Sequence, residues 1–239
     1  MSSLKVYKDL NGLSKASCTS CDKKRLYFCY DCHKYMPEIE DKVPSIELPV
    51  SIEIIKHPAE KNSKSTAIHC KLIAPNQTRI FDSKSEIPCF NDSEQFPNTV
   101  LVYPDSSAIS IAEYVKENGP IQKFIFLDAT WYTVREIQKK KELRGIPTVM
   151  LRTYQTEYWR PQKGLSNKYL ATIEAIRYAV EENADASGAP FNAEKLLFWF
   201  YYFRQMVDQN LCNKNNTNKI TVKNDDNSNI DEMVTVKNC

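Results

Sequence analysis

Two groups of residues in this chain have the types and spacing that chemistry requires. The first group follows a short apolar run at residues 124–127 and consists of Asp128, Thr130 and Trp131. A carboxylate, a hydroxyl and an indole thus lie where a buried parallel strand is predicted to end and a helix to begin. Ligands bind at that edge of open α/β sheets, so this stretch is a candidate site. The alternative is that Asp128 or Thr130 caps the helix and Trp131 only packs.

The second group consists of four cysteines. Cys18, Cys21, Cys29 and Cys32 form two C-x-x-C pairs. Such pairs can place four thiolates around one tetrahedral zinc ion, and a structural zinc needs no open coordination position. We therefore predict a structural zinc knuckle, rather than four unligated thiols. His33 is an alternative ligand, but we interpret it as a solvated neighbour.

Composition limits the class of protein. The chain has 239 residues, 42% of them hydrophobic, which suits one α/β domain with small additions. The net charge of +2 predicts that any nucleic-acid surface is a local patch. We expect an intracellular protein without a membrane partner, because no run has the length of a membrane span and the amino terminus lacks a signal-peptide core. In a reducing compartment the eight cysteines are ligands or free thiols rather than disulfides.

The elements that position the first group follow a βαβαβ rhythm. We predict strands at residues 46–55, 99–103, 124–127 and 148–151, with helices between them, and hence a mostly parallel sheet. Pro49 indicates an irregularity or an edge position for the first strand. Ser63 or Ser65 is the expected N-cap of a helix that begins near residue 67, and Ser110 and Glu113 have the spacing of a capping box.

Three later segments complete the domain plan. Residues 152–168 form a long loop in which Arg and Lys alternate with Tyr and Trp, a combination that can hold phosphates while bases stack. The last helix, from Asn192 to about Leu211, is apolar nearly all round; core packing is the default expectation, and dimerisation is the alternative. We predict a zinc-binding knuckle at 1–36, a main domain at 37–212 and a disordered tail at 213–239.

Taken together, these residues resemble a known family, the DTW-domain tRNA-uridine aminocarboxypropyltransferases, and most closely their first eukaryotic type. The signature that names the family is present as Asp128-Ala129-Thr130-Trp131. Further blocks follow in the family's order: the four-cysteine spacing, His57-Pro58-x-Glu60, residues 64–72, Tyr103-Pro104, Trp159-Arg160-x-Gln162-Lys163-Gly164 and residues 170–176. Several blocks in order are far more specific than one short motif. One departure is a short segment between residues 107 and 122, where similar proteins carry a polar insertion.

The resemblance implies a fold and a reaction. The fold is SPOUT-like, a mostly parallel sheet with a C-terminal knot that binds S-adenosylmethionine. The reaction transfers the 3-amino-3-carboxypropyl (acp) group of S-adenosylmethionine to N3 of a uridine in the tRNA D-loop and yields acp3U and methylthioadenosine. A nuclear location is implied, with the cytoplasm as the alternative. Two other functions stay open: an RNA methyltransferase on the same scaffold, and a non-catalytic zinc-containing RNA-binding protein.

The resemblance also suggests roles for individual residues. Asp128 is either the general base for uridine N3 or a group that positions the cofactor. Glu174 orients the loop or the cofactor, or is a solvated helix residue. The full set of expected site residues is, for catalysis, Asp128, Thr130 and Trp131; for cofactor binding, Leu101, Val102, Tyr103, Pro104, Leu127, Asp128, Thr172 and Glu174; for RNA, Lys64, Arg152, Arg160 and Lys163; and for zinc, Cys18, Cys21, Cys29 and Cys32.

Overall fold

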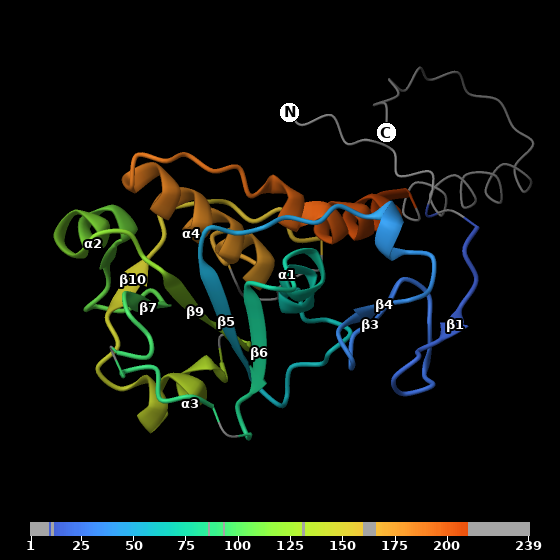
Figure 1. Cartoon of the computed structure of the whole chain (residues 1–239), viewed down its shortest axis with the longest axis horizontal. Coiled ribbons are helices and arrows are strands. Elements are labelled where there is room, and N and C mark those ends of the chain that lie inside the picture. Colours follow the sequence, from blue (N-terminus) through green and yellow to red (C-terminus); the bar gives the residue numbers. More distant parts are fainter. Residues whose placement is uncertain are drawn as a thin grey trace, which may run out of the picture.

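A six-stranded parallel sheet forms the centre of the protein (Figure 1). In this computed structural model, residues 10, 12–85, 87–92, 94–130, 132–159 and 166–209 are described. The strands are β5 (Ser51–Lys56), β6 (Thr78–Asp82), β7 (Thr99–Val102), β8 (Ile109–Ser110), β9 (Lys123–Asp128) and β10 (Thr148–Met150). Their order is β6-β5-β9-β7-β10-β8, and every neighbouring pair is parallel. The predicted α/β class with a parallel sheet is confirmed.

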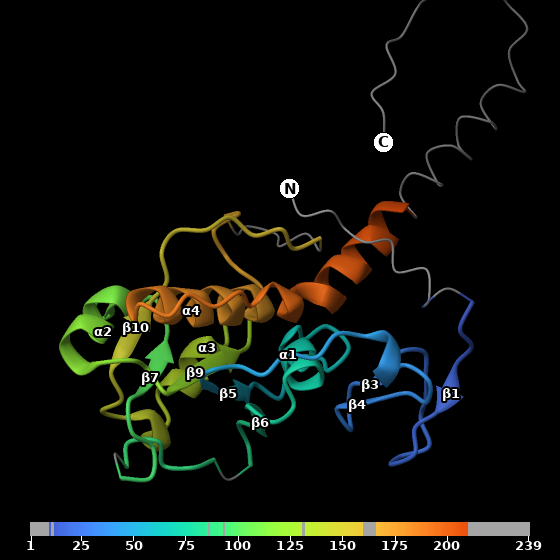
Figure 2. The ribbon, with the colours of Figure 1, turned by 45° about the horizontal axis from the view of Figure 1, so that its top comes forward.

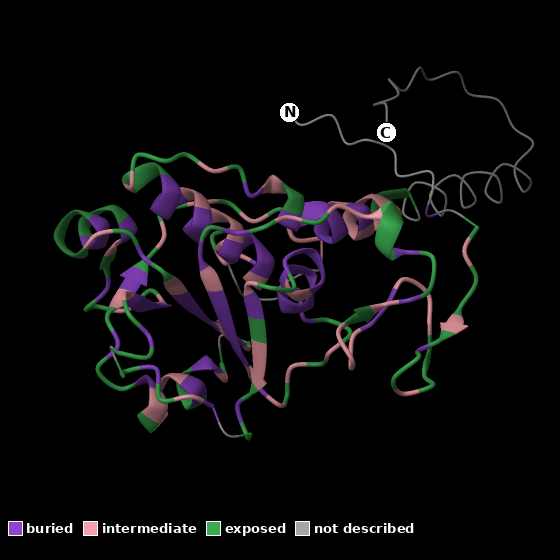
Figure 3. Cartoon of the chain, in the orientation of Figure 1, coloured by how far each residue is buried: buried purple, intermediate pink, exposed green. Residues whose placement is uncertain are grey.

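Helices cover the sheet unequally. The helical elements are α1 (Ala67–Ile73), α2 (Ile111–Asn118), α3 (Val134–Gln138), α4 (Thr172–Ala186), the 3-10 turns η2 (Glu40–Lys42), η3 (Lys141–Leu143) and η4 (Glu194–Leu197), and an α-helix at residues 198–209. One face of the sheet packs against α1, α2, α4 and the last helix, and the other packs against α3, η3 and the segment around residues 87–96. Figure 3 shows that the central strands β5 and β9 are mostly buried.

The sheet order differs from one detail of the prediction. Strand β5 begins at Ser51, after Pro49, and pairs on both sides with β6 and β9. An edge position for this strand was therefore wrong: Pro49 precedes the ladder and removes no hydrogen bond from it. The short edge strands β6 and β8 were not predicted from the sequence.

Local capping agrees with the sequence at α2 and differs at α1. The Ser110 side chain accepts a hydrogen bond from the Glu113 backbone N–H, and Glu113 accepts one from the Ser110 backbone N–H, so the capping box is confirmed. Gly119 ends α2 with a φ of 80°. Helix α1 starts after Thr66 without a side-chain cap, so the predicted N-cap role of Ser63 or Ser65 was wrong. Ser65 makes a different hydrogen bond, described below.

The amino-terminal segment folds as two small hairpins beside the last helix (Figure 2). Strand β1 (Ala16–Ser17) pairs with β2 (Lys24–Arg25), and β3 (Phe28–Cys29) pairs with β4 (Lys34–Tyr35), both antiparallel. The aromatic residues of the last helix turn into the core: Trp199 and Phe200 are fully buried. Core packing of this helix is thus confirmed. Within the described residues, we find no helix whose length and apolarity would allow it to span a membrane.

Candidate active site and cysteine cluster

A cavity of about 350 Å³ opens at the carboxyl ends of the central strands. Its walls come from three connections that follow β7, β9 and β10, together with the start of α4. Because β9 lies between β5 and β7 although it follows both in the chain, this is the place where the strand order reverses. Such switch points are where open α/β sheets bind ligands. The size also falls in the range of small-molecule sites, which begins at roughly 300 Å³.

Asp128 lies under one wall of this cavity and is almost fully buried, with 3% exposure. Its two carboxylate oxygens accept hydrogen bonds from two different elements: Oδ2 from the Ser65 hydroxyl at 2.7 Å, and Oδ1 from the Thr172 hydroxyl at 2.7 Å. Burial raises the pKa of this carboxyl above its ordinary 3.8, and the two hydrogen bonds oppose that rise. Asp128 therefore joins the turn before α1 to the first residue of α4 at the end of the central strand.

The long loop after β10 is fixed to α4 by two buried glutamates. Glu174 accepts hydrogen bonds from the Thr156 hydroxyl at 2.6 Å and from the Glu157 backbone N–H at 2.8 Å. Glu182 accepts one from the Arg152 backbone N–H and one from the Tyr154 hydroxyl, each at 3.0 Å. Both glutamates are 3% exposed. The prediction that Glu174 orients the loop agrees with these contacts, and Glu174 is not a solvated helix residue.

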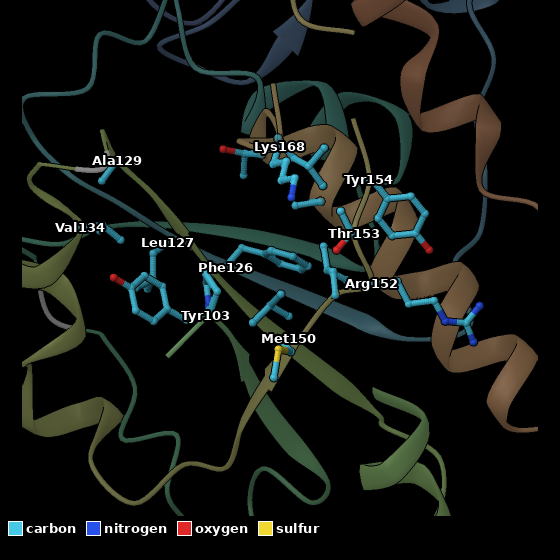
Figure 4. Close-up of a pocket in the computed structure, with 16 residues that line it drawn as sticks. Tyr103, Phe126, Leu127, Ala129, Val134, Met150, Arg152, Thr153, Tyr154 and Lys168 are labelled. Atoms are coloured by element: carbon cyan, nitrogen blue, oxygen red, sulfur yellow. The ribbon is translucent and has the colours of Figure 1, made fainter. Parts of the chain in front are cut away.

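The cavity lining is largely apolar with a few polar groups, as Figure 4 shows. The Lys168 side chain extends into the cavity among the other lining residues, whereas the Arg152 guanidinium extends away from them. Tyr103 and Leu127 lie on the side of the cavity opposite Lys168. Tyr154 stacks on Tyr178 of α4, with ring centroids 3.6 Å apart. A cation at one end and an aromatic ring at the other can hold a ligand that has an anionic end and a flat apolar end.

The expected site residues occupy four kinds of position. Val102, Tyr103, Pro104, Leu127, Thr172 and Arg152 line the cavity. Asp128, Glu174 and Leu101 are buried behind it. Thr130 is exposed, and its hydroxyl lies 3.0 Å from that of Thr133 at the start of α3. Lys64 is exposed and lines a second cavity, described below. Trp131, Arg160, Lys163 and the predicted tail lie outside the described residues.

Sequence reasoning missed three groups that the structure brings to this site. Ser65 was interpreted as a helix cap, although its hydroxyl holds Asp128. Lys168 stands at the end of the predicted basic loop but was not separated from the other cations there. Glu182 sits in the middle of a helix, where a buried acid gives no signal in the sequence. For Ser65 and Lys168 the sequence did contain a signal: Ser65 lies in the polar segment before a predicted helix, and Lys168 ends the predicted basic and aromatic loop.

The four predicted metal-ligating cysteines come together in the amino-terminal hairpins. The sulfur atoms of Cys18, Cys21, Cys29 and Cys32 all lie within 4.8 Å of one another, and Sγ of Cys21 and Sγ of Cys29 are 3.6 Å apart. Tetrahedral zinc with bonds of about 2.3 Å to sulfur separates its ligands by about 3.8 Å. The cluster contains the four thiols and not His33. Donor type, number and spacing therefore fit a tetrahedral ion.

The backbone repeats itself around this cluster. Asp22 and His33, the residues immediately after the second cysteine of each pair, have φ values of 56° and 55°. This left-handed conformation is uncommon for residues other than glycine. The same left-handed turn therefore follows each of the two pairs whose four sulfur atoms converge. His33 thus has a backbone role beside the cluster.

The cysteine hairpins are attached to the rest of the molecule by polar and apolar contacts. Asp31 accepts hydrogen bonds from Arg25 at 2.9 Å and from Asn62, in the connection between β5 and α1, at 2.8 Å. These partners, chiefly Asn62, lower the pKa of Asp31 to about 2. The rings of Tyr27 and Phe28 pack on Trp199, with centroids 5.4 and 5.0 Å apart. The hairpins therefore share one core with the parallel sheet.

Comparison with known proteins gives the family. Proteins named tRNA-uridine aminocarboxypropyltransferase 1 are similar along most of their length: that of Xenopus tropicalis is 28% identical, with 87% of this chain and 84% of the relative covered, and that of Homo sapiens is 28% identical, with 92% and 86% covered. The mouse (Mus musculus) relative is 27% identical, with 87% and 82% covered. A solved structure of the SAM-dependent rRNA acp-transferase Tsr3 from Vulcanisaeta distributa aligns with a TM-score of 0.37 and 16% identity, over 59% of this chain and 72% of that one.

The DTW domain itself matches residues 26–208, which include the second cysteine pair, the whole parallel sheet and nearly all of the last described helix. The motif that names this domain ends strand β9, where Asp128 joins α1 to α4. The match covers well over half of the chain, and this chain therefore belongs to the DTW domain family.

Proposed function

We propose that this protein transfers the 3-amino-3-carboxypropyl group from S-adenosylmethionine to N3 of a tRNA uridine, in the D-loop as the resemblance implies. The observation that carries the proposal is the cavity at the carboxyl ends of β7, β9 and β10, with the carboxylate of the DTW motif held behind it. Support comes from the similar proteins, which are named for this activity. We also propose the finer fold that the resemblance implies, a SPOUT-like C-terminal knot; in support, Lys168, Leu170 and Thr172 line the same cavity as the residues that follow β7 and β9.

The cavity offers a suitable partner for each end of S-adenosylmethionine. Lys168 is the candidate for the carboxylate of the methionyl part, because a lysine ammonium forms a strong charge-assisted hydrogen bond with a carboxylate. Tyr103, Pro104 and Leu127 provide an apolar surface for the adenine. Bound in this way, S-adenosylmethionine would supply a carbon activated by its sulfonium: as uridine N3 forms a bond to that carbon, the bond from the carbon to sulfur breaks, methylthioadenosine leaves with the electron pair, and the N3 proton passes to solvent.

Asp128 acts as a positioning residue in this proposal. Both of its oxygens already accept hydrogen bonds from hydroxyls, and 3% exposure leaves little room for direct contact with a base. Asp128 contacts the cavity only indirectly, through Thr172, whose side chain donates to it and which lines the cavity. By holding Thr172 and Ser65 in place, Asp128 fixes the distance between α4 and the turn before α1, and precise positioning is itself a large part of catalysis.

The cysteine cluster is proposed to hold a structural zinc ion. Four cysteines complete the tetrahedral set, so the ion has no open position for chemistry. Its role is to fix the two hairpins against Trp199 and against the connection between β5 and α1.

Product analysis tests the proposed reaction. The purified protein is incubated with S-adenosylmethionine and unmodified tRNA, and the small-molecule products are separated by chromatography. We expect methylthioadenosine, in an amount that depends on tRNA and that falls sharply in the Asp128→Ala variant. Formation of S-adenosylhomocysteine instead would identify a methyltransferase. The absence of both products would indicate a non-catalytic RNA-binding protein.

A further inference from the structure

A second cavity, of about 510 Å³, lies between the cysteine hairpins, the turn before α1 and the last helix. Four cations line it: Lys15, Lys24, Arg25 and Lys64. Arg25 is already paired with the Asp31 carboxylate at 2.9 Å, so the remaining charge comes from the three lysines. Among the described residues that form its lining there is no aspartate or glutamate. In a chain with a net charge of only +2, this concentration of positive charge is local. Such a patch attracts phosphates.

Aromatic side chains alternate with these cations in the same cavity. Tyr27, Tyr30, Trp159 and Phe203 line it. The Arg25 guanidinium lies over the Tyr30 ring, 4.2 Å from its centroid. Nε of Arg25 is buried and has no hydrogen-bond partner among the described residues. Cations for phosphates beside rings for bases are the combination that binds single-stranded nucleic acid.

The second cavity is linked to the first through Asp128. Ser65 lines the second cavity and donates to Oδ2 of Asp128, whereas Thr172 lines the first and donates to Oδ1. One buried carboxylate thus accepts hydrogen bonds from a lining residue of each cavity.

From these observations we propose that the second cavity binds a single-stranded segment of the RNA substrate next to the modified uridine. Its phosphates contact Lys15, Lys24 and Lys64, and a base stacks at Tyr30. The inference rests on the proposed function and adds to it the place where the RNA is held. It also gives the cysteine hairpins a second role, because they contribute Lys15, Lys24, Arg25 and Tyr30 to this surface.

The first test removes charge from the cavity. In the double variant Lys15→Gln/Lys24→Gln two exposed side chains change, and the control Lys116→Gln removes an exposed charge from α2, at the opposite end of the molecule (Figure 1). We expect tRNA affinity, measured by fluorescence anisotropy, to fall about 10-fold or more in the double variant alone. The slope of log affinity against log salt should become shallower by about 1.4, roughly 0.7 for each phosphate contact with a single strand. Affinity for S-adenosylmethionine should not change.

The second test addresses stacking, with an eight-residue oligouridylate as the probe. Tyr30→Leu should weaken its binding about fivefold or more, and Tyr30→Phe should restore it, because a base needs only the ring. If Tyr30→Leu binds normally and an oligoglutamate peptide competes as well as the oligouridylate, the cavity takes an acidic protein segment and the inference is wrong.

The outcomes separate this inference from the proposed function. If the wild-type protein forms acp3U while the double lysine variant keeps its tRNA affinity and salt slope, the second cavity does not hold RNA but the activity stands. If the wild-type protein neither binds tRNA nor forms the product, both proposals are overturned.

Discussion

The two cavities on either side of Asp128 are built in opposite ways. The first is formed by the ends of three parallel strands and the start of α4, and it is mostly apolar with one inward lysine. The second is formed by the cysteine hairpins, the turn before α1 with the start of that helix, Trp159 and the last helix, and its lining carries lysines and aromatic rings. A sheet edge holds a small ligand in a fixed position, whereas a charged surface gathers a long anion from solution. The difference suggests a division of work between cofactor and RNA, with Asp128 between them.

Loss of the metal site should have the largest effect, and it should act on the second cavity much more than on the first. Cys21→Ser removes one of four ligands, and zinc binding to such sites contributes roughly 10 kcal/mol or more of folding free energy in small domains. We expect the cysteine hairpins to unfold, tRNA affinity to fall below that of the Lys15→Gln/Lys24→Gln variant, and the midpoint of thermal unfolding to drop. S-adenosylmethionine affinity should change much less, because no lining residue of the first cavity comes from the hairpins.

Calorimetry, metal analysis and RNA binding measure these effects. Cys89→Ser is the matched control, since Cys89 is exposed and lies outside the cluster. If Cys21→Ser retains a normal unfolding midpoint, or if the wild-type protein carries no stoichiometric zinc, the structural role of the cluster is wrong.

Replacement of Asp128 should lower turnover more than it lowers the affinity for S-adenosylmethionine or for tRNA. Asp128→Asn keeps the shape of the side chain but changes one acceptor into a donor. We expect kcat to fall about 100-fold, the scale associated with a small misplacement of reacting groups, with only small changes in S-adenosylmethionine and tRNA affinity. Equal turnover by the variant and the wild type would remove Asp128 from the mechanism.

The pH dependence of stability tests the environment of this carboxyl. Its pKa is raised by burial in the folded protein, so the folded state holds the proton more tightly than the unfolded chain. Its stabilising contribution is therefore complete below the ordinary pKa of 3.8 and is lost as pH rises through the folded pKa. The free energy of unfolding of the wild type, minus that of Asp128→Asn, should decrease as pH rises over this range in urea titrations. A difference that is constant with pH would show an unshifted pKa.

A substitution in the first cavity alone should weaken cofactor binding and leave RNA binding unchanged. Lys168→Gln removes the inward cation, and a hydrogen bond to a charged group contributes about 1.5–3 kcal/mol. We therefore expect S-adenosylmethionine affinity to fall at least about 10-fold in calorimetric titration, with tRNA affinity unchanged. Lys168→Arg should recover most of the loss. If Lys168→Gln weakens tRNA binding instead, this lysine belongs to the RNA surface.

The smallest effect is expected far from both cavities. Ser110→Ala breaks the capping box of α2 and should cost about 1 kcal/mol, or a few degrees in the unfolding midpoint. Both affinities should stay at wild-type values, and Ser110→Asp should restore stability. A loss of either affinity in Ser110→Ala would mean that α2 is coupled to the cavities.

The first cavity was predictable from the sequence because many of its lining residues lie at the ends of strands or directly follow them in the chain. Tyr103 and Leu127 lie at the carboxyl ends of runs that are apolar enough to be recognised, and parallel strands bring those ends together. The second cavity was not predictable, because Lys24 and Phe203 meet only through the tertiary packing of Tyr27 and Phe28 against the last helix. The hydrogen bond of Ser65 was not predictable for the same reason. A serine before a helix predicts an N-cap, whereas its contact with Asp128 depends on where the sheet places strand β9.

The origin of the transferred carbon atoms is the most direct test of the proposed reaction. Unmodified tRNA is incubated with the protein and with S-adenosylmethionine that carries ¹³C either in the methyl group or in the methionyl chain, and the nucleosides are then analysed by mass spectrometry. We expect a modified uridine that contains the chain label and never the methyl label. A uridine that contains the methyl label, or no labelled nucleoside at all, would contradict it.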